Sequence, residues 1–220
     1  MFWYSDNNIL ASESVGLDEV GRGPLAGPVV AAAVWICDNF ATLAREKFSQ
    51  FAIRDSKKMT PRRRALVTEW IQQLPANIIR YSIASASIEE IDRLNILNAA
   101  LLAMARAYDA LKFEAKIALV DGNRAPNLQN CSVKTVIGGD DKVLAISVAS
   151  IIAKEHRDAL MKSLAQEFPQ YAWDKNVGYG TREHLEAIEK FGISPHHRRS
   201  FAPISAATEV VQKSVALVLS

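Results

Sequence analysis

Residues 14–37 restrict the fold more than any other stretch, because two apolar segments flank a turn that is rich in glycine and proline. The segments 14–20 and 28–37 predict two strands, and GRGPLAGP between them is long enough for an antiparallel return. The first strand carries two adjacent acids, Asp18 and Glu19, near the turn. Neighbouring residues on a regular strand point to opposite faces. Either the turn from Gly21 distorts the strand end, or one acid contributes from the rim of a site.

The remaining segments alternate between strands and helices before helices dominate the end of the chain. Strands are expected at 77–87, 115–122 and 132–136, and helical regions at 61–73, 87–112, 143–167, 181–192 and 204–218. This order predicts an α/β fold with a mixed central sheet flanked by helices. We expect one domain over residues 1–220, with a helical C-terminal part, about 181–220, packed on it.

Composition excludes several classes of protein. The 220 residues can form one sizeable core, and the formal net charge of +2 is too small to indicate a nucleic-acid partner by itself. Two cysteines, Cys37 and Cys131, do not make a disulfide framework and favour a reducing compartment. The sequence shows neither a signal peptide nor an apolar stretch of membrane-spanning length. We therefore expect a cytoplasmic protein without a membrane partner.

Four acids lie in or just after apolar strands and near glycine: Asp18, Glu19, Asp121 and Asp140. Each acid alone is explained as well by a turn or a helix cap. Several carboxylates brought together at strand ends would need a compensating cation, because burying an unpaired charge is costly. Oxygen ligands suit Mg²⁺ or Mn²⁺. The four histidines and two cysteines show no spacing typical of a zinc site.

Two basic runs and a glycine-flanked tyrosine suggest a polyanion partner. The runs contain Lys57, Lys58, Arg62, Arg63 and Arg64 in DSKKMTPRRR, and Arg198 and Arg199 in HHRRSF. Each run is either a solvated face or part of a groove for a polyanion. The GRG turn, Gly21 to Gly23, would let backbone amides approach a phosphate or sugar, with Arg22 adding charge. Tyr179 either stacks on a sugar or base or packs back on the surface.

These motifs together resemble those of the type 2 ribonucleases H (ribonuclease HII), in their bacterial form. The matching segments occur in family order over residues 15–203: DEVGRGPLAGPVV, DSKK, LNILNA, VDGN, SVASIIAK with RD, FPQY, GYGT, EHL and HHRRSF. The resemblance implies a ribonuclease H-like fold and cleavage of RNA strands paired with DNA, including single ribonucleotides inside duplex DNA. The alternatives are a non-catalytic nucleic-acid-binding module of the same fold and another metal-dependent nuclease, such as a resolvase.

The resemblance also implies the catalytic acids. Asp18, Glu19, Asp121 and Asp140 match positions that hold two divalent ions, Mg²⁺ or Mn²⁺. Asp141 and Asp158 compete for the fourth place, but the family's acid stands seven residues before the serine of the S-x-A-S helix, which points to Asp140. Gly138 occupies a position where the family usually has lysine.

The same resemblance implies the substrate contacts. Gly21, Arg22, Gly23 and Tyr179 match the elements that recognise the junction where a ribonucleotide precedes DNA, and Lys57 of DSKK is a further substrate-binding candidate. The expected products carry a 5′-phosphate and a 3′-hydroxyl. The expected partners are RNA/DNA hybrids and ribonucleotide-containing duplex DNA, bound by a monomer.

Overall fold

The computed structural model describes residues 10–202 and 204–205. Its chain divides into two compact units, each described here by itself. The first unit comprises Met1–Val20, Val30–Ser85 and Ala100–Arg157, and the second comprises Gly21–Val29, Ala86–Ala99 and Asp158–Ser220. The single domain expected over residues 1–220 stays a prediction.

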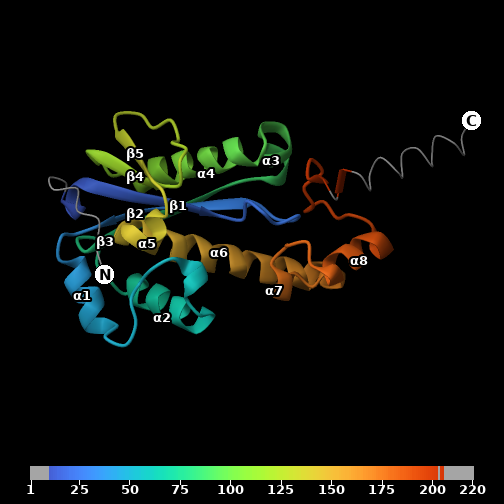
Figure 1. Ribbon diagram of the computed structural model, residues 1–220, viewed down its shortest axis with the longest axis horizontal. Coiled ribbons are helices and arrows are strands. Elements are labelled where there is room, and N and C mark those ends of the chain that lie inside the picture. Colours follow the sequence, from blue (N-terminus) through green and yellow to red (C-terminus); the bar gives the residue numbers. More distant parts are fainter. Residues whose placement is uncertain (1–9, 203, 206–220) are drawn as a thin grey trace, which may run out of the picture. The chain divides into compact units, whose positions relative to one another are not determined.

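A five-stranded mixed sheet forms the first unit, as predicted (Figure 1). Its order is β3-β2-β1-β4-β5. The strands are β1 (Ser14–Val20), β2 (Val29–Ile36), β3 (Ile79–Ala86), β4 (Ile117–Asp121) and β5 (Ser132–Val136). β1 pairs antiparallel with β2, which confirms the expected return, and β4 runs parallel to both β1 and β5. Three neighbouring strands therefore end at the same edge of the sheet.

The helices of the first unit cover both faces of this sheet. Figure 1 shows α4 (Ile96–Leu111) on one side of β1 and β2, and the beginning of α6 (Leu144–Glu167) on the other. β2 is an apolar run that is buried along its whole length, as expected for a strand covered on both faces. A methyl group on Gly16 of β1 would lie 2.4 Å from the carbonyl carbon of Ala145, so only glycine lets α6 approach this closely.

Smaller helices complete the first unit. They are α1 (Phe40–Lys47), α2 (Pro61–Gln72), α5 (Gly139–Lys142) and the 3₁₀ turns η1 (Ala11–Glu13) and η2 (Ser56–Lys58). Thr60 caps α2 by accepting a hydrogen bond from the Arg63 amide, and Pro61 is its first residue. The sequence analysis predicted α2 but neither α1 nor α5.

The helical region expected over 87–112 consists of two helices, α3 (Ile88–Leu94) and α4. Ser87 and Glu90 form the predicted capping box at the start of α3. Asn95, with φ 66°, ends α3, and its side chain accepts from the Leu97 and Asn98 amides. One residue thus ends one helix and caps the next.

The second unit has its own apolar core. It contains the loop Gly21–Val29, α3, the later part of α6, and the elements η3 (Pro169–Tyr171), α7 (Trp173–Asn176) and α8 (Arg182–Phe191). The core includes Leu25, Met161, Trp173 and Ile188. Thr181 caps α8 and Gly192 follows its end, as predicted. The helix expected at 204–218 lies outside the described residues, apart from 204–205.

Within the part of the chain that the structure describes, we find no helix with the length and apolar character required to span a bilayer.

Candidate active site

Two candidate acids stand side by side where parallel strands end. Leu17 of β1 pairs with Val120 of β4, and Asp18 and Asp121 are the next residue on each strand. Asp121 in turn pairs with Val136, the last residue of β5, which leads to Asp140 four positions later. The convergence expected from the sequence follows from the parallel order of β1, β4 and β5.

Asp18 is the most deeply buried of these acids, with 5% of the residue exposed. Burial raises its pKa well above the usual value, and the negative charges of Glu19 and Asp121 raise it further. A hydrogen bond with the Ser150 side chain opposes this rise. One carboxylate oxygen, Oδ1, accepts a hydrogen bond of 2.7 Å from the Glu19 amide. A charged Asp18 therefore calls for a nearby cation.

The adjacent pair Asp18 and Glu19 sits on an undistorted strand. Asp18 pairs with Ala32, Glu19 with Ala31 and Val20 with Val30, so the ladder is regular up to the turn. Asp18 shares a face with Gly16, the residue that packs on α6, while Glu19 points to the other face and is half-buried. Of the two arrangements expected, the regular ladder supports a contribution of Glu19 from the rim.

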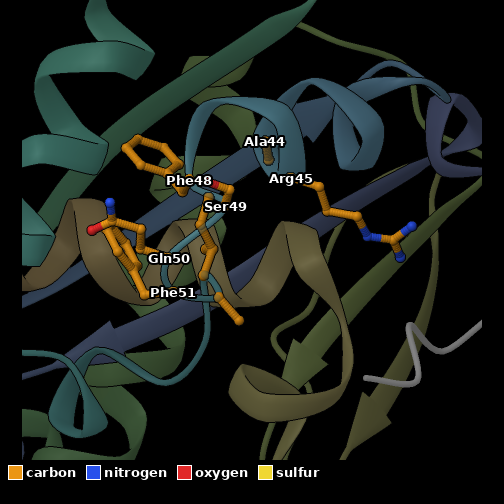
Figure 2. Close-up of a pocket in the computed structure, with 8 residues that line it drawn as sticks. Ala44, Arg45, Phe48, Ser49, Gln50 and Phe51 are labelled. Carbon is orange, nitrogen blue, oxygen red and sulfur yellow. The ribbon is translucent and has the colours of Figure 1, made fainter.

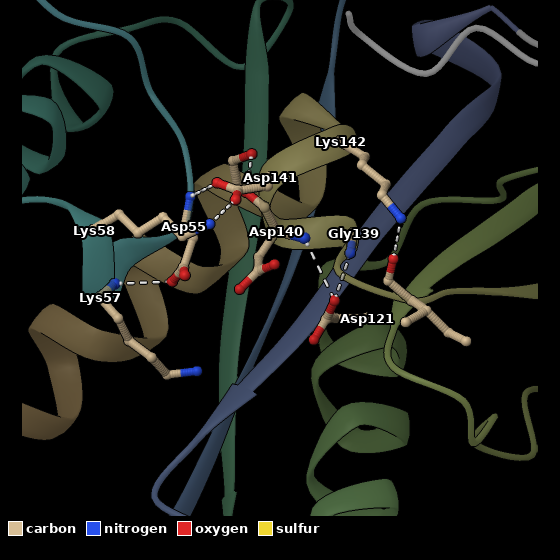
Figure 3. A network of polar contacts seen from close by, with 10 residues as sticks. Asp55, Lys57, Lys58, Asp121, Gly139, Asp140, Asp141 and Lys142 are labelled. Atoms are coloured by element: carbon tan, nitrogen blue, oxygen red, sulfur yellow. Dashed lines mark hydrogen bonds and ion pairs between the residues drawn. The ribbon is translucent and has the colours of Figure 1, made fainter.

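Asp121 and Asp140 are joined through the short helix α5. One oxygen of Asp121, Oδ1, accepts hydrogen bonds from the Gly139 amide at 2.7 Å and the Asp140 amide at 3.4 Å (Figure 3). The Ser147 hydroxyl donates to the Asp140 carbonyl at 2.6 Å, which ties α5 to α6. Gly138 precedes α5 in the left-handed conformation, with φ 65°.

Asp140 and Asp141 have opposite electrostatic environments. Burial, then the charges of Asp121 and Asp55, raise the pKa of Asp140 to about 6, although Lys57 opposes them. Asp141 forms an ion pair with Lys58, and this hydrogen bond lowers its pKa (Figure 3). Asp141 is engaged with a lysine, so Asp140 is the better candidate for a cation. Asp158, the third competitor, belongs to the second unit.

Asp55 is an acid that the sequence analysis did not single out. It is buried, and its carboxylate accepts a hydrogen bond of 2.9 Å from the Lys57 amide. Its own amide donates to Asp141 at 3.4 Å, and its charge contributes to the raised pKa of Asp140 (Figure 3). The sequence signal for Asp55 was its place at the start of the DSKK motif, in which the sequence analysis considered only the lysines.

The donor chemistry of the four predicted acids fits a hard divalent cation. All four offer carboxylate oxygens, and burial together with repulsion from Glu19 and Asp121 raises the pKa of Asp18. Among the described residues, no three histidine, cysteine, aspartate or glutamate side chains form a finished ligand set. The fit therefore rests on oxygen donors and on the repulsion between neighbouring carboxylates.

The predicted substrate-contacting residues of the second unit also come together. Gly21 is buried with φ 93°, while Arg22 and Gly23 are exposed. A methyl group on Gly23 would lie 3.3 Å from Cε1 of Tyr179, so the Tyr179 ring borders the glycine turn. Tyr179 remains 44% exposed. Its ring is thus accessible for stacking and lies beside the glycine turn.

The chain is similar to known proteins of one family. A family model described as "Ribonuclease HII" matches residues 15–204. The chain belongs to the ribonuclease HII family. It is 53% identical to "Ribonuclease HII" of Paramagnetospirillum magneticum over 86% of this chain and 90% of the relative. It is 47% identical to "Ribonuclease HII" of Sphingopyxis alaskensis over 90% of this chain and 92% of the relative.

A solved structure of a type 2 ribonuclease H shares the fold. The "ribonuclease H2 from Pyrococcus horikoshii OT3" superimposes with a TM-score of 0.71 and 24% identity, covering 91% of this chain and 99% of that one. The mixed sheet with flanking helices is therefore the ribonuclease H-like fold that the motifs predicted.

Two arginines of the basic runs are buried in this ribonuclease HII chain, although the sequence predicted either a solvated face or a groove for a polyanion. Arg64 donates to Glu155 at 2.7 Å and to the carbonyl oxygens of Ser56 and Met59. Arg198 has no exposed surface. Both side chains organise the interior, because a guanidinium can satisfy several carbonyl oxygens at once. Lys57 of the first run is exposed, as a substrate contact must be.

A cavity of about 340 Å³ is lined by residues between 44 and 53, none of which is a predicted site residue (Figure 2). It is lined by the end of α1 and the segment after it, including Phe48, Phe51 and Ile53. Its lining contains no carboxylate, so it lacks the donors that the chemistry requires.

Proposed function

We propose that this protein is a metal-dependent endoribonuclease. It hydrolyses the RNA strand of RNA/DNA hybrids and cuts 5′ of single ribonucleotides embedded in duplex DNA, leaving 5′-phosphate and 3′-hydroxyl ends. The observation that carries the proposal is the buried Asp18, whose pKa is raised by burial and by the charges of Glu19 and Asp121. A protein that only bound nucleic acid would gain nothing from this repulsion.

Asp18, Glu19, Asp121 and Asp140 would hold Mg²⁺ or Mn²⁺. Two such ions, when bound, would supply activation of a water and charge stabilisation of the leaving 3′ oxygen in an in-line displacement. Asp18 and Asp121 act from adjacent strand ends, and Asp140 acts from α5, which is tied to α6. The Gly139 amide holds Asp121 in place through Oδ1.

Recognition of the ribonucleotide would rest on the glycine turn. Arg22 and Gly23 are exposed residues, and their backbone N–H groups would donate to a 2′-hydroxyl, the group that distinguishes RNA from DNA. Tyr179 would stack on the following deoxyribose and disfavour a second ribose there. Lys57 would contact a backbone phosphate.

The expected setting is a monomer in the cytoplasm. Cys37 and Cys131 are free thiols, which suits a reducing compartment. Light scattering of the purified protein with and without a duplex tests the monomer, and fractionation of the source cells tests the compartment.

The function is tested with three duplexes of one sequence: all-DNA, DNA with one ribonucleotide, and an RNA/DNA hybrid. With Mg²⁺ the second and third are expected to be cut, the second 5′ of the ribonucleotide, and the all-DNA duplex is expected to stay intact. Mapping the product ends checks the 5′-phosphate and 3′-hydroxyl. Cleavage of the all-DNA duplex would indicate another nuclease, and binding without cleavage would indicate a non-catalytic module.

A further inference from the structure

Arg198 is a buried cation whose guanidinium faces the backbone of the glycine turn. The residue has no exposed surface. Its Nη2 donates to the Gly21 carbonyl at 2.5 Å, its Nη1 to the Arg22 carbonyl at 3.1 Å, and its Nε to the Gly27 carbonyl at 2.9 Å. A guanidinium stays charged when buried, and its planar fork of donors matches several carbonyls at once. One side chain therefore fixes three peptide groups of the loop 21–29.

These contacts set the direction of the neighbouring amide groups. In a trans peptide the C=O of one residue and the N–H of the next point in opposite directions. When the Gly21 carbonyl points inward to Arg198, the Arg22 N–H points outward, and the Arg22 carbonyl fixes the Gly23 N–H in the same way. Gly21 is buried whereas Arg22 and Gly23 are exposed, in agreement with this orientation.

Arg198 is itself held firmly by its surroundings. Its backbone amide donates to the Leu25 carbonyl at 2.9 Å, and its guanidinium carbon lies 5.0 Å from the centre of the Phe201 ring. The next two amides, of Arg199 and Ser200, donate to the Asp92 carboxylate at 3.1 and 2.9 Å. Asp92 thus anchors the segment that carries Arg198 from outside the loop 21–29, while the Leu25 contact belongs to that loop.

We propose that Arg198 is a positioning residue, which presents the outward N–H groups of Arg22 and Gly23 to the ribonucleotide. This inference rests on the proposed function, because those amides matter only if the turn binds a ribose. Preorganised donors bind without the cost of ordering the loop, so Arg198 contributes to substrate choice without touching the substrate.

The test compares variants in their preference for two duplexes that differ by one ribonucleotide, measured as a ratio of Kd values in EDTA. Arg198→Lys keeps the charge but loses the planar fork, and we expect the preference to fall roughly tenfold, the value of one aligned hydrogen bond. Phe201→Leu removes the aromatic ring beside the Arg198 guanidinium, and we expect a smaller fall in the preference. Ile188→Ala removes apolar core of the same unit as a stability control, and its preference should equal that of the wild type.

Cleavage kinetics with Mg²⁺ separate positioning from general damage. Arg198→Lys is expected to raise KM for the single-ribonucleotide duplex while kcat stays near the wild-type value, because the carboxylates are untouched. An Arg198→Lys protein that is folded and keeps the wild-type preference overturns the inference. If Arg198→Lys does not fold, Phe201→Leu decides, and an unchanged preference there overturns it. A wild type that does not cut at the ribonucleotide refutes the proposed function instead.

Discussion

Replacing Asp140 by asparagine removes a negative charge that lowers the stability of the folded, metal-free protein. The pKa of Asp140 is raised to about 6 by burial and by the charges of Asp121 and Asp55, against a usual value of 3.8. Since one pKa unit corresponds to about 1.4 kcal/mol, the charged carboxylate costs about 3 kcal/mol before solvent screening. Asp140 is less than half buried, and screening reduces the cost to about 1–2 kcal/mol.

The effect of the Asp140 charge on the free energy of unfolding depends on pH. A raised pKa means that the folded protein keeps the proton more tightly than the unfolded chain. Wild-type stability therefore falls as pH rises from 3.8 to about 6, and the full loss is present above that value. In EDTA at pH 7.5 we expect Asp140→Asn to be more stable than the wild type by about 1–2 kcal/mol, and this gain should vanish near pH 4.

Urea unfolding at both pH values measures the difference, with Asp141→Asn as the matched control. The hydrogen bond from Lys58 lowers the pKa of Asp141, so Asp141→Asn should destabilise the protein at pH 7.5. Mg²⁺ that binds the folded state adds stability, and Asp140→Asn lacks one of the carboxylates proposed to bind it. Saturating Mg²⁺ should therefore stabilise the wild type more than Asp140→Asn. Equal losses of stability for the two variants at pH 7.5 without metal would refute the reasoning.

Three further changes test separate parts of the structure. Burial and the charge of His184 lower the pKa of His197 to about 4, so stability should fall by up to about 3 kcal/mol as pH drops from 6.5 toward 4, and thermal unfolding of His197→Phe should show a flatter pH profile. Gly16→Ala places a methyl group against the α6 backbone and should cost about 1–3 kcal/mol in urea unfolding, whereas an unchanged midpoint would contradict that contact. Tyr179→Ala should reduce the preference for a single ribonucleotide over a long hybrid, and an unchanged ratio of cleavage rates would count against stacking.

The strands and the position of the acids were predictable because both depend on local pattern. The apolar runs on either side of GRGPLAGP specified β1, β2 and their antiparallel return. Acids near glycine at strand ends indicated where charge would gather, and parallel strands then bring Asp18 and Asp121 to one edge. The regular ladder through Glu19 was not predictable, because register depends on the partner strand.

The short helix α5 was not predictable, because tertiary contacts make it. Its four residues follow a strand and begin with glycine, which is a poor helix former. The Asp121 carboxylate accepts from its first amide, and the Ser147 hydroxyl donates to the Asp140 carbonyl. These partners are distant in sequence or belong to the next helix.

The burial of two arginines also could not be predicted from the sequence alone. A run of cations indicates surface, yet Arg64 and Arg198 are buried, where they satisfy backbone carbonyl oxygens. Which carbonyls need a donor is known only after the loops are folded.

The most direct measurement of the central claim is a metal-triggered cut. The wild type and Asp18→Asn are each bound in EDTA to duplex DNA with one ribonucleotide, and excess Mg²⁺ is then added. The wild type is expected to cut 5′ of the ribonucleotide only after Mg²⁺ arrives, while Asp18→Asn binds the duplex and leaves it intact. Cleavage in EDTA, or cutting by Asp18→Asn at the wild-type rate, would contradict a carboxylate-held metal as the source of the activity.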